Sequence, residues 1–103
     1  MPLVSARTIT AANQWTSPVL ISGSFTATIR RADGAVGSLG GTTVTVQRSV
    51  DNGASYQDVD RWTSTSEELG FEGDVAIYTI GVKADEFADS VFVGFAYVGS
   101  PKS

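Results

Sequence analysis

Acidic side chains are the residues in this sequence best suited to chemistry, because they occur in close pairs. The pairs are Asp58 and Asp60, Glu67 and Glu68, and Glu72 and Asp74. Two carboxylates on one strand face could serve a glycosidase or a calcium site, and Asp58 and Asp60, two residues apart, would share such a face. No pair has calcium-loop spacing, so solvation of an exposed strand is the favoured interpretation. We therefore expect neither catalytic residues nor metal ligands.

Two residue types that most enzymes use are missing from the chain. The sequence contains no cysteine and no histidine. Their absence excludes disulfides, the usual serine and cysteine triads and most zinc sites. The net charge of −4 also argues against a nucleic acid partner, because proteins that bind phosphate backbones present a basic surface. We expect a protein that is not an enzyme and needs no cofactor.

Aromatic side chains offer a second kind of site, because they could stack on sugar rings. Trp15, Tyr56 and Trp62 are the candidates, and a carbohydrate-binding module with a β-sandwich fold would have a similar composition. Burial is the favoured interpretation, since aromatic residues supply much of the apolar area in small β-domains.

A hairpin over residues 43–59 is the strongest local signal. Thr43 to Gln47 alternate between apolar and polar residues, and a turn around Asp51, Asn52 and Gly53 follows. The turn resembles the Asp-box, a structural hairpin motif of several unrelated β-proteins. Its positions are matched by Ser49, Asp51, Gly53, Ser55 and Tyr56, with tyrosine in place of the commoner tryptophan. In that motif the aspartate bonds turn amides and the aromatic residue packs on the hairpin, remote from any active site.

The remaining chain shows strand patterns separated by glycine-rich or acidic turns. An amphipathic strand with a bulge near Gly23 is predicted at 19–32, a loop at 33–42, a turn at 66–73, and apolar strands at 75–83 and 91–98. Residues 84–89 could form one helical turn. The pattern favours an all-β fold, a single β-sandwich or jelly roll of about seven or eight antiparallel strands.

The length of 103 residues corresponds to one domain. We expect an N-terminal arm at 1–14 that joins a sheet edge or reaches a neighbouring subunit, a β-domain at 15–98, and a polar tail at 99–103. Residues 1–7 lack the features of a signal peptide, and the apolar run at 91–98 is too short to span a bilayer. A soluble chain made in the cytoplasm, without a membrane partner, is expected.

Several segments together resemble a family of short phage proteins that coat capsids. They are Ser22 to Phe25, Thr43 to Ser49, Asp51 to Gly53, Tyr56 to Val59, Glu67 to Phe71 and Tyr78 to Lys83. The resemblance runs from Trp15 to Tyr97, about four-fifths of the chain, and rests on turn and strand signatures.

The resemblance implies a decoration, or cement, protein of the virion: a homotrimer on the capsid surface that clamps the major capsid protein. Three weak contacts made together would supply the stabilisation by avidity. The expected capsid contacts are Val4, Arg7, Ile9 and Leu39. The expected trimer contacts are Phe92, Phe95 and Tyr97. The alternative is a carbohydrate-binding or adhesin-like module of a phage tail or fibre, with Trp15 and Trp62 as stacking platforms.

Overall fold

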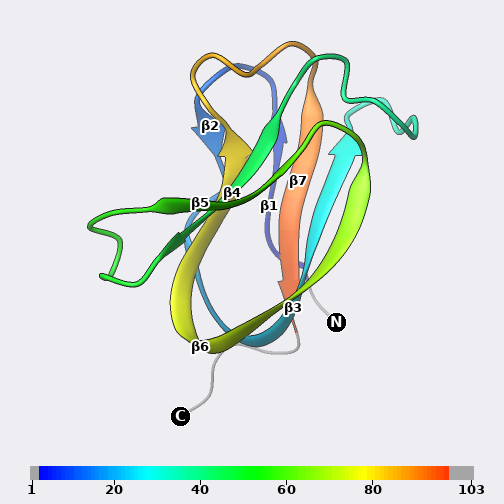
Figure 1. Ribbon diagram of the computed structural model, residues 1–103. Helices are drawn as coiled ribbons and strands as arrows, with labels where there is room; N and C mark the ends of the chain where they lie inside the picture. The colour runs from blue at the N-terminus through cyan, green and yellow to red at the C-terminus, as the bar shows by residue number, and fades with distance from the viewer. Residues whose placement is uncertain (1–2, 98–103) are drawn as a thin grey trace.

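The chain folds entirely into β-strands and turns. The structure, a computed structural model, describes the backbone of residues 3–97 and the side chains of residues 5–96. Its strands are β1 (Leu3–Ile9), β2 (Gln14–Trp15), β3 (Val19–Arg31), β4 (Val44–Ser49), β5 (Gln57–Trp62), β6 (Ser66–Val82) and β7 (Val91–Tyr97) (Figure 1). None of the described residues forms a helix that could cross a membrane. The all-β prediction is confirmed.

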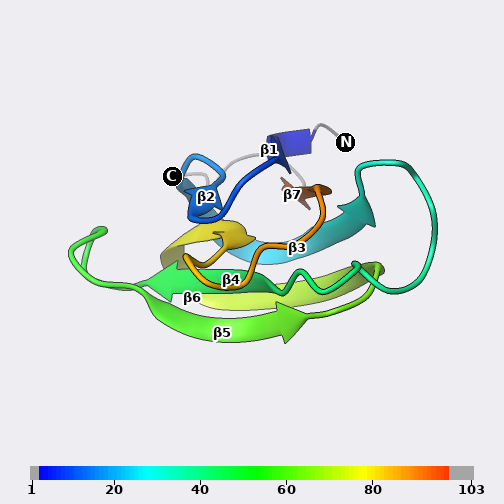
Figure 2. The ribbon, with the colours of Figure 1, turned by 90° about the horizontal axis from the view of Figure 1, so that it is seen from above.

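The seven strands form one antiparallel sheet in the order β1-β7-β3-β6-β4-β5, and β2 pairs with β6 outside this path. The long strands β3 and β6 curve, so that β1 and β7 lie over β4 and β5 as the two layers of a sandwich (Figure 2). The jelly roll that was the other expected architecture is not confirmed, because it comprises eight strands in two sheets.

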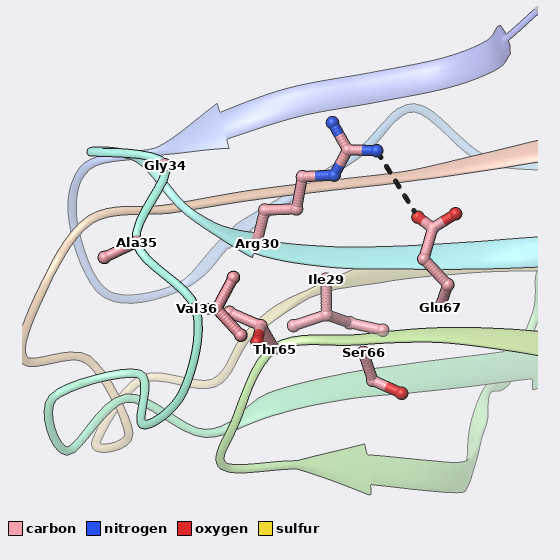
Figure 3. Close-up of a pocket in the computed structure, with 8 residues that line it drawn as sticks. All are labelled: Ile29, Arg30, Gly34, Ala35, Val36, Thr65, Ser66 and Glu67. Atoms are coloured by element: carbon pink, nitrogen blue, oxygen red, sulfur yellow. Dashed lines mark ion pairs between the residues drawn. The ribbon is translucent and has the colours of Figure 1, made fainter.

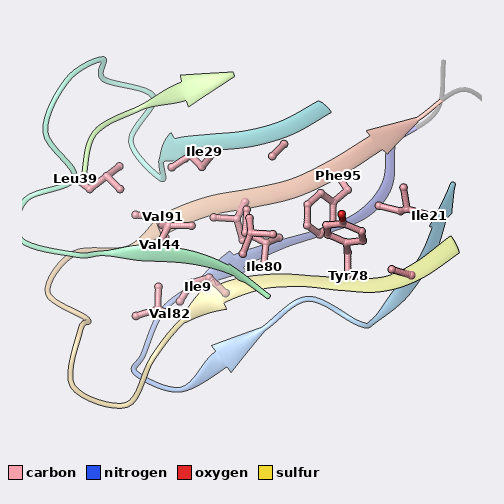
Figure 4. Packing of buried hydrophobic residues seen from close by; sticks show 14 residues of the cluster. Ile9, Ile21, Ile29, Leu39, Val44, Tyr78, Ile80, Val82, Val91 and Phe95 are labelled. Carbon is pink, nitrogen blue, oxygen red and sulfur yellow. The ribbon is translucent and has the colours of Figure 1, made fainter. Parts of the chain in front are cut away.

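The hydrophobic core fills the space between these layers (Figure 4). Alternate residues of β7 and of the second half of β6 point into it, including Val93, Phe95, Tyr78 and Ile80. The rings of Phe95 and Tyr78 meet edge to face with centroids 5.9 Å apart, and Phe25 completes an aromatic cluster with both. Such edge-to-face contacts stabilise the core beyond simple burial.

The predicted bulge in the first long strand is confirmed. The pairing of β3 with β6 shifts register between Ile21 and Gly23, and Gly23 has a φ of 83°. Glycine takes this left-handed backbone conformation without the strain that a side chain would cause.

The predicted turn at 66–73 is wrong, because these residues continue as the first half of β6. Gly70 lies opposite Phe25 on β3, and a Cβ atom at Gly70 would come within 2.4 Å of that ring. The glycine that suggested a turn therefore makes room for an aromatic ring in a strand pair. Residues 84–89 form no helical turn, which the sequence had left open, and a backbone hydrogen bond from Glu86 to Lys83 closes a simple turn there.

The segment expected as an arm joins the edge of the sheet, as one of the two alternatives proposed. β1 pairs with β7 along its length, from Leu3 opposite Ala96 to Ile9 opposite Val91. Gly94 allows the close approach, since a Cβ atom there would lie 2.7 Å from the carbonyl oxygen of Ser5. The tail at 99–103 lies outside the described residues.

Candidate functional site

The pair Asp58 and Asp60, which looked most like a catalytic pair, is split between the two faces of β5. A bulge pairs Asp60 with Val46 and Asp58 with the next residue, Gln47, and adjacent strand residues point to opposite faces. The expectation that both carboxylates share a face is therefore wrong. Asp58 binds Lys83 and Gln47, and these contacts, with Lys83 the larger cause, lower its pKa.

A buried charge cluster lies on the inner face of the fold, and sequence reasoning missed it. The Glu72 carboxylate is 4% exposed and accepts hydrogen bonds from Arg48 Nε at 2.6 Å, Arg48 Nη2 at 2.8 Å and the Tyr78 hydroxyl at 2.8 Å. The amide of Asp74 donates a further bond of 3.1 Å. Alternation along β6 is the sequence pattern that indicates this cluster, because it places Glu72 on the same core face as Ala76 and Tyr78.

The charges in this cluster stabilise one another. The Arg48 guanidinium is the main reason that the pKa of Glu72 falls to about 2, and Glu72 in turn raises the pKa of Arg48. Burial, and then the hydrogen bond to Glu72, raises the pKa of Tyr78 to about 12. A carboxylate held ionised by a fixed cation is a poor proton donor at neutral pH, so the cluster is structural in its chemistry.

The other described cations are also committed to structural contacts. Four further ion pairs join Arg30 to Glu67, Arg31 to Asp33, Arg61 to Glu86 and Lys83 to Asp58. Arg7 donates to the carbonyl oxygen of Trp15 at 2.9 Å. Within residues 3–97, no group of three or more acidic side chains is placed to hold a metal ion.

The Asp-box residues form the hydrogen bonds expected of that motif. Asp51 accepts bonds from the hydroxyl of Ser49 at 2.7 Å, from the amide of Ser55 at 2.9 Å and from the Ser55 hydroxyl. The amide of Gly53 donates to Ser49 Oγ, and the hydroxyl of Tyr56 lies beside Gly53. These bonds, with the Ser55 hydroxyl as the largest cause, lower the pKa of Asp51 to about 2. The motif folds the turn.

Replacing Asp51 with alanine should loosen this turn without unfolding the domain. The amide of Ser55 loses its acceptor, so its hydrogen exchange, followed by NMR, should become at least about tenfold faster. The melting temperature should fall by only a few degrees, since the turn lies outside the core. Asp85→Ala, which removes another exposed carboxylate, is the matched control. Unchanged exchange at Ser55 in Asp51→Ala would contradict the assignment.

The two tryptophans do not form one stacking platform. Trp15 lies on β2 and covers Gly81, where a Cβ atom would come within 2.8 Å of its ring. Trp62 lies on β5 and packs against the hydrophobic core. Two strands, β6 and β4, separate β2 from β5 in the sheet. The geometry therefore does not bring these side chains together as a sugar site would require.

Three of the seven residues expected to contact a partner belong to the core. Ile9, Leu39 and Phe95 are fully buried, so these side chains are not available to a second protein. The sequence cannot distinguish the two roles, because a large apolar residue beside a loop or a strand end is equally common in a core and in an interface. Arg7 is exposed, and Phe92 is half-buried on the outer face of β7. The side chains of Val4 and Tyr97 lie outside the described ones.

A groove between β5 and the first half of β6 gathers three exposed apolar residues. Leu69 is 86% exposed, Phe71 73% and Val59 49%. Together with Trp62 and with Phe25, Ala27, Val46 and Tyr78 beneath, they line a cavity of about 190 Å³. Sequence reasoning missed this groove because it assigned Glu67 to Phe71 to a turn. We call it the β5/β6 groove.

A second hollow lies where β3 ends and β6 begins (Figure 3). Its volume is about 410 Å³, and the loop residues Gly34, Ala35 and Val36 form one wall. Arg30 and Glu67 face each other across its rim, with Arg30 Nη2 3.7 Å from Glu67 Oε2. The hollow is open to solvent, the charges of Arg30 and Glu67 at its rim compensate each other, and its lining contains no reactive group.

Comparisons of the chain with protein-family models, with curated proteins and with solved structures found no match. The candidate site therefore rests on the geometry of the chain itself. Within residues 5–96, that geometry includes charges paired for stability and an apolar groove between β5 and β6. Exposed apolar residues that lie together are suited to contact with another molecule.

Proposed function

We propose that this protein is a non-enzymatic structural protein of a phage virion that decorates and stabilises the capsid. Its partners are the major capsid protein and further copies of itself, arranged as a trimer. The segments from Ser22 to Lys83 that resemble capsid-coating proteins suggest the class. The observation that carries the proposal is the β5/β6 groove.

Exposed apolar residues on a small domain are suited to protein contact. Leu69 and Phe71 lie two positions apart on β6, so both point to the same side of the strand. Exposed apolar side chains that lie side by side, as these two do, often mark a surface for contact with another protein. Covering them would contribute binding energy without any chemical step.

The proposal also accounts for the arrangement of charges. The Arg48 and Glu72 ion pair and the hydrogen-bonded turn at Asp51 fix the local shape of the domain. A protein that stabilises a capsid needs a rigid domain with a binding surface. Its overall affinity for the capsid increases when three copies bind together.

The first test is the mass of the purified chain by light scattering, followed by co-sedimentation with empty heads of its phage. We expect a stable trimer that pellets with the heads. A monomer that stays in the supernatant over all head concentrations would exclude the capsid role.

The double substitution Leu69→Ser and Phe71→Ser should weaken head binding by about 30- to 700-fold, because it removes two anchors of about 1–2 kcal/mol each. Both side chains are exposed, so the melting temperature should change by only a few degrees. Val36→Ser is the matched control, since Val36 is 91% exposed but lies outside the groove. Equal head binding by the double variant and the control would show that the groove is not the contact.

A further inference from the structure

The β5/β6 groove lies between two strand edges that have no partner in the described part of the chain. β5 pairs only with β4, and the stretch of β6 from Glu67 to Phe71 pairs only with β3. The two strands leave the connection 63–65 and diverge (Figure 1). Backbone hydrogen bonds at Thr63 and Thr65 tie that connection to the loop containing Leu39, so the narrow end of the wedge is fixed. Free strand edges are templates for another strand.

The interior of the groove would accept apolar side chains. Its floor consists of Phe25, Ala27 and Val46, which belong to the core side of the sheet. Val59 and Phe71 form opposite walls. A strand that entered the wedge would place every second side chain on this apolar surface.

The groove also carries two carboxylates without a cation. Asp60 on one wall accepts a bond from the amide of Arg61, and Glu68 on the other accepts one from the hydroxyl of Ser66. Both donors are neutral. Within residues 3–97 no ion pair includes either carboxylate, and the guanidinium of Arg61 binds Glu86 instead. The groove therefore presents uncompensated negative charge beside an apolar floor.

We propose that the β5/β6 groove binds an extended segment of a partner protein, which adds as a strand to the free edge of β6 at 67–71. Alternate apolar side chains of this segment fill the groove, and a lysine or arginine lies between Asp60 and Glu68. Main-chain hydrogen bonds give such a complex its affinity, and the side-chain pockets and charges give it selectivity. The inference rests on the proposed function, since it names the kind of segment through which the capsid partner is held.

The test uses the full chain and a synthetic peptide of about nine residues, a length within the range of natural strands. Valine and threonine alternate in this peptide around one central lysine. We expect saturable binding by NMR titration, with slower amide exchange at 67–71. A peptide with central glutamate should bind at least about tenfold more weakly, and a peptide N-methylated on alternate residues should not bind, because it lacks the strand hydrogen bonds.

The double variant Asp60→Asn and Glu68→Gln keeps the shape of the groove and removes its charge. Its preference for lysine over glutamate should disappear while weak binding to both peptides remains. Asp74→Asn and Asp85→Asn together, which remove the same charge outside the groove lining, should keep the preference.

Three outcomes would overturn the inference. They are no saturable binding of the lysine peptide at millimolar concentration, binding without protection at 67–71, and equal binding of the lysine and glutamate peptides. If amide exchange at 67–71 slows with rising protein concentration in the absence of peptide, the occupant of the groove is a second copy of this chain and not a different partner. A chain that pellets with heads but ignores the peptides refutes the strand site alone, whereas one that binds the peptides but not the heads refutes the capsid role.

Discussion

Phe95→Ala should lower the free energy of unfolding by about 3–5 kcal/mol, the usual cost of removing a buried aromatic side chain. Phe95 is fully buried and contacts the rings of Phe25 and Tyr78 at centroid distances of 6.0 and 5.9 Å. The substitution leaves a cavity between the two layers, and close-packed neighbours collapse into it only partly. For a domain of this size the melting temperature should fall by more than about 10 °C. Thermal unfolding followed by circular dichroism measures it.

Phe92→Ala is the matched control, because it removes the same ring from the outer face of the same strand. Phe92 is half-buried, so its loss should cost less than half as much stability. The pair of variants also separates a core role from an interface role. Phe95→Ala with a nearly unchanged melting temperature but an altered mass in light scattering would contradict the assignment of Phe95 to the core.

Features that depend on neighbouring residues could be predicted from the sequence. The hairpin at Asp51 and the bulge at Gly23 follow from turn chemistry and the backbone freedom of glycine. The all-β fold follows from the alternation of apolar and polar residues, which is itself local. Each of these predictions needs no knowledge of which strand pairs with which.

Features that depend on pairing between distant strands could not be predicted. The stretch Glu67 to Phe71 contains a glycine and two glutamates and resembles a turn, yet pairing with β3 holds it as a strand. A turn at this stretch would leave Glu72 outside any strand, so a local pattern gives no indication of its core position or of its bond to Arg48. Tertiary contacts override local propensity in such cases.

The dependence on distant strand pairing also explains why the sequence does not predict the β5/β6 groove. The β5/β6 groove exists because β5 and the first half of β6 fail to pair after a short connection, although hairpin pairing is the usual outcome. Likewise, the choice of Ile9 and Leu39 as partner contacts required knowing which face of each segment meets the core. Periodicity shows that two faces differ, but strand register decides which face is buried.

The Arg48 and Glu72 pair should produce the second large effect, and the size of this effect depends on pH. The pKa of Glu72 is lowered from 4.5 to about 2, so the carboxylate stabilises the fold above its unfolded pKa and loses this effect as the pH falls through about 2. The shift corresponds to stabilisation on the order of 3 kcal/mol at neutral pH. The pKa of Tyr78 is raised to about 12, so its contribution is present below pH 10 and is lost as the pH rises toward 12.

Arg48→Met should therefore destabilise the protein more than Glu72→Gln does at pH 7. The methionine leaves a carboxylate that is 4% exposed without its cation, whereas the glutamine leaves a guanidinium that is 32% exposed and can hydrate. The double variant should be more stable than Arg48→Met alone, because it buries no uncompensated charge. Lowering the pH from about 5 to 2 should shrink the difference between wild type and Glu72→Gln, since the carboxylate then protonates. Urea unfolding at several pH values measures these differences, with Lys83→Met, which breaks the exposed pair with Asp58, as a control of small effect. Three results together would contradict a charge-compensated pair. The two single variants would lose equal stability, their losses would simply add in the double variant, and the difference between wild type and Glu72→Gln would not depend on pH.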